Sequence, residues 1–238
     1  RYASGAFVDA VVANQIRALS ADVINALAES NYGLDLRYEY QRILSAEQIN
    51  GLTQKSINAI YSTIRQCFTQ EDVSMFTTPT LTKLLAALHT VPTSWAGDEY
   101  SGWLWKINEK QISNLGVEAG VNLYRAWTKN NEKMVYAGKN IDGTDTDPII
   151  VKQFQALSTD VINALTENNY DFDLRYEYQK ILSADQINGL SNASINAIYP
   201  TIALKIAKAD ISSLSNTALT KKLLDLKILQ GEWVSDGK

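Results

Sequence analysis

The chain has 238 residues, a formal net charge of −4, and 45% hydrophobic against 20% charged residues. This is the composition of an ordinary soluble globular protein that is long enough to bury a sizeable core. The negative charge argues against nucleic acids and anionic membrane surfaces as partners, because both attract basic proteins. No apolar run approaches the roughly 18 residues of a membrane-spanning helix, so membrane insertion is not expected. A single cysteine excludes an internal disulfide framework.

The first 44 residues predict three helices. Residues 1–14 carry an apolar run, which predicts a helix that docks onto the first repeat. From Leu19 the chain reads Leu-Ser-Ala-Asp-Val-Ile, so that Ser20 has the position of an N-cap residue. Residues 31–33 (Asn-Tyr-Gly) interrupt this helix, and residues 34–44 predict a longer one.

An eight-residue pattern fills residues 44–85. Each octad opens with a large apolar residue that is usually followed by Ser or Thr, and a second apolar residue comes five places later. The mean spacing of four residues does not fit the 3.6-residue turn of one continuous α-helix. If Ser45 is an N-cap, Leu44 and Ile49 have the positions of a hydrophobic staple and Gln48 closes a capping box.

The other octads fit the same frame with Thr53, Thr69 and Thr77 as N-caps. Pro79 then falls within a first helical turn, where its missing N–H does no harm. Gly51 has the position of a left-handed residue that ends a helix. Each octad therefore predicts a short capped helix that turns and restarts.

A much longer repeat covers the whole chain. Residues 15–64 recur at 153–202 with 37 of 50 positions identical, and matches at the same offset of 138 residues continue beyond this block. Because short helices are marginal in isolation, they must bury their apolar faces on neighbouring repeats, as in a solenoid. We therefore predict an all-α, solenoid-like array of short capped helices with two copies of a unit, the second partial.

Three segments follow from this repeat: a first helical block at residues 1–94, a Trp-rich junction at 95–151, and a second, partial block at 152–238. The junction contains four of the five tryptophans. Within it, Asn108 has the position of an N-cap, residues 117–128 predict a helix, and residues 138–148 predict a turn-forming loop.

The sequence predicts no catalytic residues and no cofactor. Cys67 and His89 are the only thiol and imidazole, and a nucleophilic pair would need both. At the matching positions the second copy has Lys205 and Lys227, so a structural cysteine and a surface histidine are favoured. Zinc lacks enough ligands, and no Gly-rich phosphate loop, serine nucleophile elbow or metalloprotease motif is present.

Three carboxylates, those of Asp142, Asp145 and Asp147, fall within six residues of one predicted loop. Oxygen-rich loops bind calcium, but this spacing lacks the Glu and Gly positions of an EF-hand. Asx-turns in a solvated loop are the favoured interpretation, and calcium is the alternative.

Aromatic and charged residues provide the candidates for interaction. An Arg-Tyr-Glu-Tyr motif occurs twice, and its Arg and Tyr residues could form an exposed patch of the kind found at protein interfaces. Packing of these tyrosines between repeats is favoured. Tryptophans could stack on sugar rings, although large aromatics at a junction are more often core residues. The candidates are Arg37, Tyr38, Tyr40, Arg175, Tyr176, Tyr178, Trp95, Trp103, Trp105 and Trp233.

The frame Leu-Ser-Ala-Glu-Gln-Ile-Asn-Gly at Leu44, which recurs at Leu182, resembles the Leu-Thr-x-x-Gln-Ile-x-x-Leu tandem octads of very large bacterial secreted or surface proteins. This resemblance covers about half of the chain. It implies a bacterial origin, an exported repeat array and repeats without enzymatic activity.

We therefore expect a non-enzymatic structural protein of a bacterial extracellular or surface assembly that stacks head-to-tail into a fibre or filament. Its partners would be further copies of itself or further repeats of the same polypeptide, with Phe7, Val12 and Leu229 as end contacts. The alternative is an adhesin or secreted effector module that binds a protein or glycan through a helical-repeat face. An enzyme ranks third.

Overall fold

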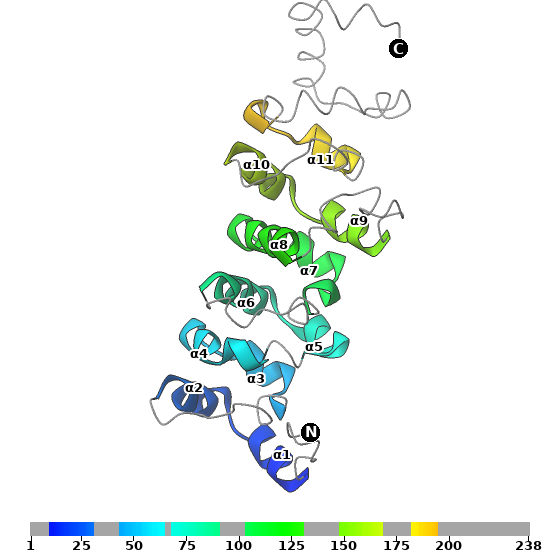
Figure 1. The fold of residues 1–238 in the computed structure, drawn as a ribbon. Coiled ribbons are helices and arrows are strands. Elements are labelled where there is room, and N and C mark those ends of the chain that lie inside the picture. The colour runs from blue at the N-terminus through cyan, green and yellow to red at the C-terminus, as the bar shows by residue number, and fades with distance from the viewer. Residues whose placement is uncertain are drawn as a thin grey trace, which may run out of the picture. The chain divides into compact units, whose positions relative to one another are not determined.

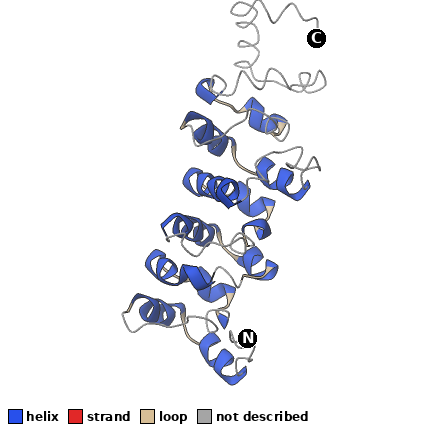
Figure 2. Cartoon of the chain, in the orientation of Figure 1, coloured by secondary structure: helices blue, strands red, loops and turns tan. Residues whose placement is uncertain are grey.

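The computed structural model describes residues 10–30, 43–64, 68–90, 103–130, 148–168 and 182–194. Contacts divide the chain into two compact units, unit 1 at Arg1–Asn130 and unit 2 at Asn131–Lys238. Every regular element in the described ranges is a helix, and none is a strand, as Figure 2 shows. This part of the chain is therefore all-helical, as the sequence predicts.

In unit 1 the helices come in consecutive pairs, each made of a leading helix and a following helix that begins three or four residues later. The leading helices are α1 (Ala10–Arg17), α3 (Ala46–Asn50), α5 (Gln70–Met75) and α7 (Glu109–Ser113). The following helices are α2 (Ala21–Glu29), α4 (Gln54–Ile64), α6 (Thr78–Thr90) and α8 (Val117–Asn130). A 3-10 turn, η4 (Leu104–Lys106), precedes α7.

Consecutive pairs of unit 1 pack mainly through their following helices. The following helices contact one another in the order α2, α4, α6, α8, and α3 contacts both α2 and α5. Figure 1 shows the following helices of this unit in one column and the leading helices in another. The core lies between successive pairs, where the fully buried side chains include Leu52, Ile57, Leu81, Leu85 and Leu123.

In unit 2 the structure describes α9 (Pro148–Gln155), α10 (Thr159–Glu167) and α11 (Ala184–Asn188). The first two form a pair of the same kind, and α10 packs against α11. Phe154, Leu157 and Leu165 are buried in this unit.

The predicted N-caps are confirmed wherever the structure describes them. Ser45 accepts a hydrogen bond from Gln48 N at 3.2 Å, and the Gln48 side chain accepts one from Ser45 N at 2.9 Å, which completes the capping box. The hydroxyl groups of the other predicted caps also accept from the backbone N–H three residues on, and the amide oxygen of Asn108 does the same. These caps are Ser20, Thr53, Thr69 and Thr77.

The prediction of one short helix per octad is wrong in one respect. The octad at Leu44 forms a five-residue helix, whereas the octad at Leu52 begins an eleven-residue helix that runs past its own end. The difference has a packing cause, because Ile60, Tyr61 and Ile64 extend the buried stripe of α4 for another full turn. Short and longer helices therefore alternate.

The predicted left-handed conformation of Gly51 is also wrong. Its φ of −84° and ψ of −3° lie in the right-handed region. The glycine is required instead by its close approach to Ala21, because a Cβ added at position 51 would lie 2.4 Å from the Cβ of Ala21. The matching Gly189 in unit 2 has the same role, since its Cβ would lie 2.6 Å from Cγ2 of Thr159.

Several predictions concern residues outside the described ranges. These are residues 34–42 of the helix predicted at 34–44, residues 138–147 of the loop predicted at 138–148, residue Cys67, and the matches beyond residue 194. The division into segments 1–94, 95–151 and 152–238 stays a prediction.

Candidate functional site

The most regular polar feature of the structure is a set of glutamine bridges between helix pairs. The Gln48 side chain uses its oxygen to cap α3, and its Nε2 donates to the carbonyl oxygens of Ile16 and Leu19 at 2.9 and 2.8 Å. These carbonyls lie at the C-terminal end of α1 and just beyond it, and Ile16 O also accepts from Leu19 N at 3.1 Å. A single buried amide therefore caps the start of one helix and the end of another.

The same bridge occurs at two further positions. In unit 1, Gln111 Nε2 donates to Val73 O at 2.7 Å and to Phe76 O at 3.0 Å. In unit 2, Gln186 Nε2 donates to the carbonyl oxygens of the residues that match Ile16 and Leu19, namely Phe154 at 3.1 Å and Leu157 at 2.7 Å. Each bridging glutamine stands five residues before the N-cap position of the next helix.

Helix α5 has an aspartate where α3 and α7 have this glutamine. Asp72 caps its own helix by accepting from Thr69 N at 2.9 Å, but a carboxylate has no N–H to donate backwards. Lys83 of α6 supplies the missing donor, because its Nζ donates to Leu52 O at 2.6 Å. The bridging position is therefore satisfied by a different side chain rather than left empty.

Asparagines make a second bridge, from one following helix to the next pair. Asn25 Nδ2 donates to Gly51 O at 3.0 Å, and its Oδ1 accepts from Thr53 N at 2.9 Å. In unit 2, Asn163 makes both equivalent contacts, with Gly189 O at 3.3 Å and Ser191 N at 2.9 Å. Asparagine can do this because its amide offers a donor and an acceptor side by side.

A carboxylate closes this junction in both units. Glu29 accepts from Thr53 Oγ1 at 2.5 Å and from Ser56 Oγ at 3.0 Å, and its other oxygen lies 3.3 Å from Lys55 Nζ. The Thr53 hydroxyl, followed by that of Ser56, lowers the pKa of the Glu29 carboxyl below its usual 4.5. Glu167 accepts from Ser191 Oγ at 2.5 Å in the same way.

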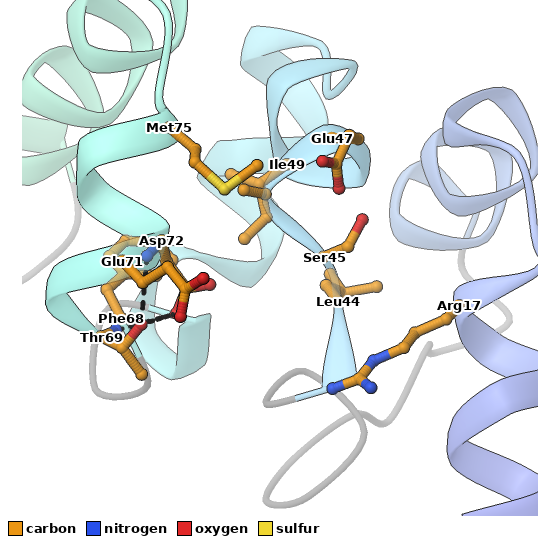
Figure 3. A pocket seen from close by; sticks show the side chains of 11 residues that line it. Arg17, Leu44, Ser45, Glu47, Ile49, Phe68, Thr69, Glu71, Asp72 and Met75 are labelled. Carbon is orange, nitrogen blue, oxygen red and sulfur yellow. Dashed lines mark hydrogen bonds between the residues drawn. The ribbon is translucent and has the colours of Figure 1, made fainter.

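A groove of about 470 Å³ opens in unit 1 between α1, α3 and α5 (Figure 3). Its apolar lining consists of Leu44, Ala46, Ile49 and Phe68, which are buried, and of Met75, which is 47% exposed. Such a combination of an apolar base with a polar rim is typical of binding sites.

Charged side chains form the rim of this groove. Glu47, Glu71 and Asp72 contribute carboxylates, and Arg17 is the cation among the lining residues. Arg17 donates through Nε to Ile43 O at 3.0 Å, and Figure 3 shows its side chain reaching from α1 toward the segment that carries Leu44. Two hydrogen bonds to the Glu47 carboxyl, one from the backbone N–H of Glu47 and one from the Ser45 side chain, lower the pKa of this carboxyl.

The structure describes three of the predicted contact residues. Trp103 is 1% exposed and meets Phe68 edge-to-face with ring centroids 5.9 Å apart, so it is a core residue. Trp105 is half-buried and stacks on Trp127 at 6.0 Å. Val12 is half-buried in α1.

The other predicted site residues lie outside the described ranges: Arg37, Tyr38, Tyr40, Arg175, Tyr176, Tyr178, Trp95, Trp233, Asp142, Asp145, Asp147, Phe7, Leu229 and Cys67, together with the side chain of His89. Within the described ranges no three His, Cys, Asp or Glu side chains come together as a metal site requires. No helix in the same ranges has the length and apolar character needed to cross a bilayer.

Sequence reasoning assigned Gln48 to its own capping box and missed its second hydrogen bonds. The signal was present, because Gln stands five residues before the N-cap position in five of the six described repeats of the frame, the exception being Asp72. Capping alone accepts Glu as well as Gln, so a preference for the amide indicates a use for its N–H groups. Comparison with protein-family models, curated proteins and solved structures found no match to this chain.

Proposed function

We propose that the chain is a non-enzymatic structural repeat protein, a solenoid-like array of helix pairs that stacks head-to-tail into a fibre or filament of a bacterial surface or extracellular assembly. One observation carries this proposal. Polar residues that are identical in the two sequence copies, such as Gln48 with Gln186 and Asn25 with Asn163, join one helix pair to the next.

An enzyme or a receptor would be expected to keep its repeated polar residues around a ligand. Here they bind backbone carbonyls and amides of the neighbouring pair, where their effect is to fix spacing and register. Repeat proteins gain their stability from such nearest-neighbour contacts. The bacterial surface location rests on the resemblance of the octads at Leu44 and Leu182 alone.

Self-association of the purified chain tests this proposal. Sedimentation and negative-stain electron microscopy should show concentration-dependent linear particles, and charged substitutions at Val12 and Leu229 should shorten them. Replacing both Cys67 and His89 by Ala should leave assembly unchanged, because the second copy has lysines at these positions. A chain that stays monomeric at every concentration would contradict the proposal.

A binding module is the second candidate, and the groove between α1, α3 and α5 is the observation that favours it. Two of its lining residues, Glu71 and Met75, have Ala209 and Ser213 at the matching positions of the second copy, so the repeat pattern alone does not require them. Its carboxylates and apolar base suit a basic peptide with apolar side chains.

Calorimetric titration with a Lys-rich amphipathic peptide tests this second function. The double substitution Glu71→Ala and Met75→Ser, which copies the second-copy residues, should abolish binding while leaving the melting temperature nearly unchanged. An unaltered affinity in that variant would exclude the groove as the binding site.

A further inference from the structure

The outward face of the α1–α2 pair differs from that of every later helix pair in unit 1. The relevant position is the third residue of each following helix, called N3 here. In α4 this residue is Ser56, and its hydroxyl donates to Glu29 at 3.0 Å and reaches Asn25 O at 3.5 Å. The N3 side chain therefore faces the following helix of the preceding pair, which for α4 is α2.

Burial at N3 shows which pairs have such a neighbour. Ser56 of α4, Thr80 of α6 and Ala119 of α8 are 0–2% exposed. Val23 has the N3 position of α2 and is 42% exposed. Among the four following helices of unit 1, the N3 side chain is thus open in α2 alone.

The leading helices show the same contrast independently. Gln15 of α1 stands five residues before the N-cap Ser20, the position from which Gln48 and Gln111 donate to two carbonyls of a preceding pair. Gln15 is exposed, whereas Gln48, which has the same position in α3, is 5% exposed. Val11, one turn earlier on α1, is 62% exposed.

We propose that this α1–α2 face, defined by Val11, Gln15 and Val23, is the docking surface for a second copy of the chain. The proposal rests on the proposed head-to-tail function and names the surface that it uses. It treats Gln15 as a bridge donor and Val23 as the apolar contact of an interface of the same kind as those inside unit 1.

The chemistry of the occupant follows from the interfaces inside the chain. A partner must offer two carbonyls, three residues apart, at the end of a leading helix, because Gln48, Gln111 and Gln186 all bind such pairs. The partner must also offer the side of a following helix, which would cover the N3 residue Val23. Each helix pair of this chain has both features in fixed relative position, so a second copy provides them without any new surface.

The test compares two valines of equal exposure in the first turn of a helix. Val23→Asp should weaken self-association of the full chain in sedimentation velocity by roughly tenfold or more, since docking would remove a carboxylate from water without a partner. Val117→Asp is the matched control, because Val117 of α8 is 43% exposed and also lies in a first turn. It should leave association unchanged.

A second pair of variants tests the bridge. Gln15→Glu removes the N–H donors and places a carboxylate against carbonyl oxygens, so it should also weaken association, whereas Gln54→Glu at an exposed position of α4 should not. Melting curves of Val23→Asp and Gln15→Glu should match that of the parent chain, because both side chains are exposed in the isolated chain.

Cross-linking identifies the partner directly. With Cys67→Ser as background, Val23→Cys provides a single thiol for a photoactivatable cross-linker, and mass spectrometry of the dimeric band should find a following helix of a second chain. Association that is equally strong in Val23→Asp, Gln15→Glu and the parent would overturn the docking surface and leave head-to-tail assembly standing through another surface. A parent chain that never associates would overturn both.

Discussion

The two sequence copies share their neutral bridges and differ in their charges. Gln48 and Gln186 bind equivalent pairs of carbonyls, and Asn25 and Asn163 bind equivalent backbone groups. The ion pair between Lys55 and Glu29 has no counterpart in unit 2, where Ala193 stands at the position of Lys55. The glutamate itself is kept, as Glu167.

This contrast indicates which interactions join helix pairs. An exposed ion pair contributes little in water, because both charges are well solvated when apart. The amide of Gln48 is buried and donates to two backbone carbonyls, and losing buried hydrogen bonds of this kind costs more than losing an exposed ion pair. The two copies therefore share the strong contact and differ in the weak one.

The largest effect is expected from breaking the glutamine bridge. Gln48→Glu keeps the capping oxygen but replaces the donor with a carboxylate that faces the carbonyls of Ile16 and Leu19, so unfolding should become easier by about 3 kcal/mol. Gln54→Glu is the control: Gln54 Nε2 also donates to a carbonyl, that of Lys83 at 3.1 Å, but the residue is exposed. Denaturant titrations that gave equal losses for the two variants would contradict the special role of the buried bridge.

The next largest effect concerns the close approach at Gly51. Gly51→Ala should destabilise the chain by about 1–3 kcal/mol, because its new Cβ would lie 2.4 Å from the Cβ of Ala21, which cannot rotate away. Adding Ala21→Gly removes the obstructing atom and should recover part of the loss. Two losses that simply added in the double variant would show that the contact does not limit the approach of the two helix pairs.

Acid sensitivity distinguishes the hydroxyl contacts of Glu29 from its ion pair. The pKa of Glu29 is lower in the folded state than its usual 4.5. At a pH above 4.5 the charged carboxylate therefore stabilises the fold, and this contribution is lost as the pH falls through the lowered pKa. In NMR titrations, Thr53→Ala should raise the pKa of Glu29 more than Lys55→Ala does, because the Thr53 hydroxyl is the main cause of the shift. The reverse order would make the ion pair the dominant contact.

Local features of the fold were predictable from the sequence, and contacts between pairs were not. The caps at Ser45 and Thr69 follow from residue type and spacing within four residues, and both are present. The backward hydrogen bonds of Gln48 depend on which carbonyls lie nearby, 29 and 32 residues away along the chain. A pattern of eight residues contains no information about that distance.

Gly51 and Trp103 show the same limit. Glycine after a short helix is commonly left-handed, so the sequence favoured that conformation, but here the neighbouring Ala21 decides what fits. Trp103 could equally have been an exposed stacking residue, and its burial against Phe68 depends on a residue 35 positions earlier. Both outcomes were decided by packing between helix pairs.

The smallest expected effect comes from the one following helix in unit 1 without a side-chain cap. Helices α2, α4 and α6 begin after Ser or Thr, whereas α8 begins after Gly116, whose carbonyl already accepts from Gly120 N at 2.9 Å. A Cβ at Gly116 would meet nothing within 4 Å, so Gly116→Ser adds a hydroxyl that can accept from Ala119 N at no steric cost. The melting temperature should rise by the equivalent of a few tenths of a kcal/mol, the usual difference between these caps. Gly116→Ala separates the effect of the hydroxyl from the effect of the added carbon. Alanine fits the same space but offers no acceptor, so it should stabilise less than Ser or not at all. Equal gains for Ser and Ala would mean that the loss of glycine freedom before α8, rather than the added cap, stabilises the chain.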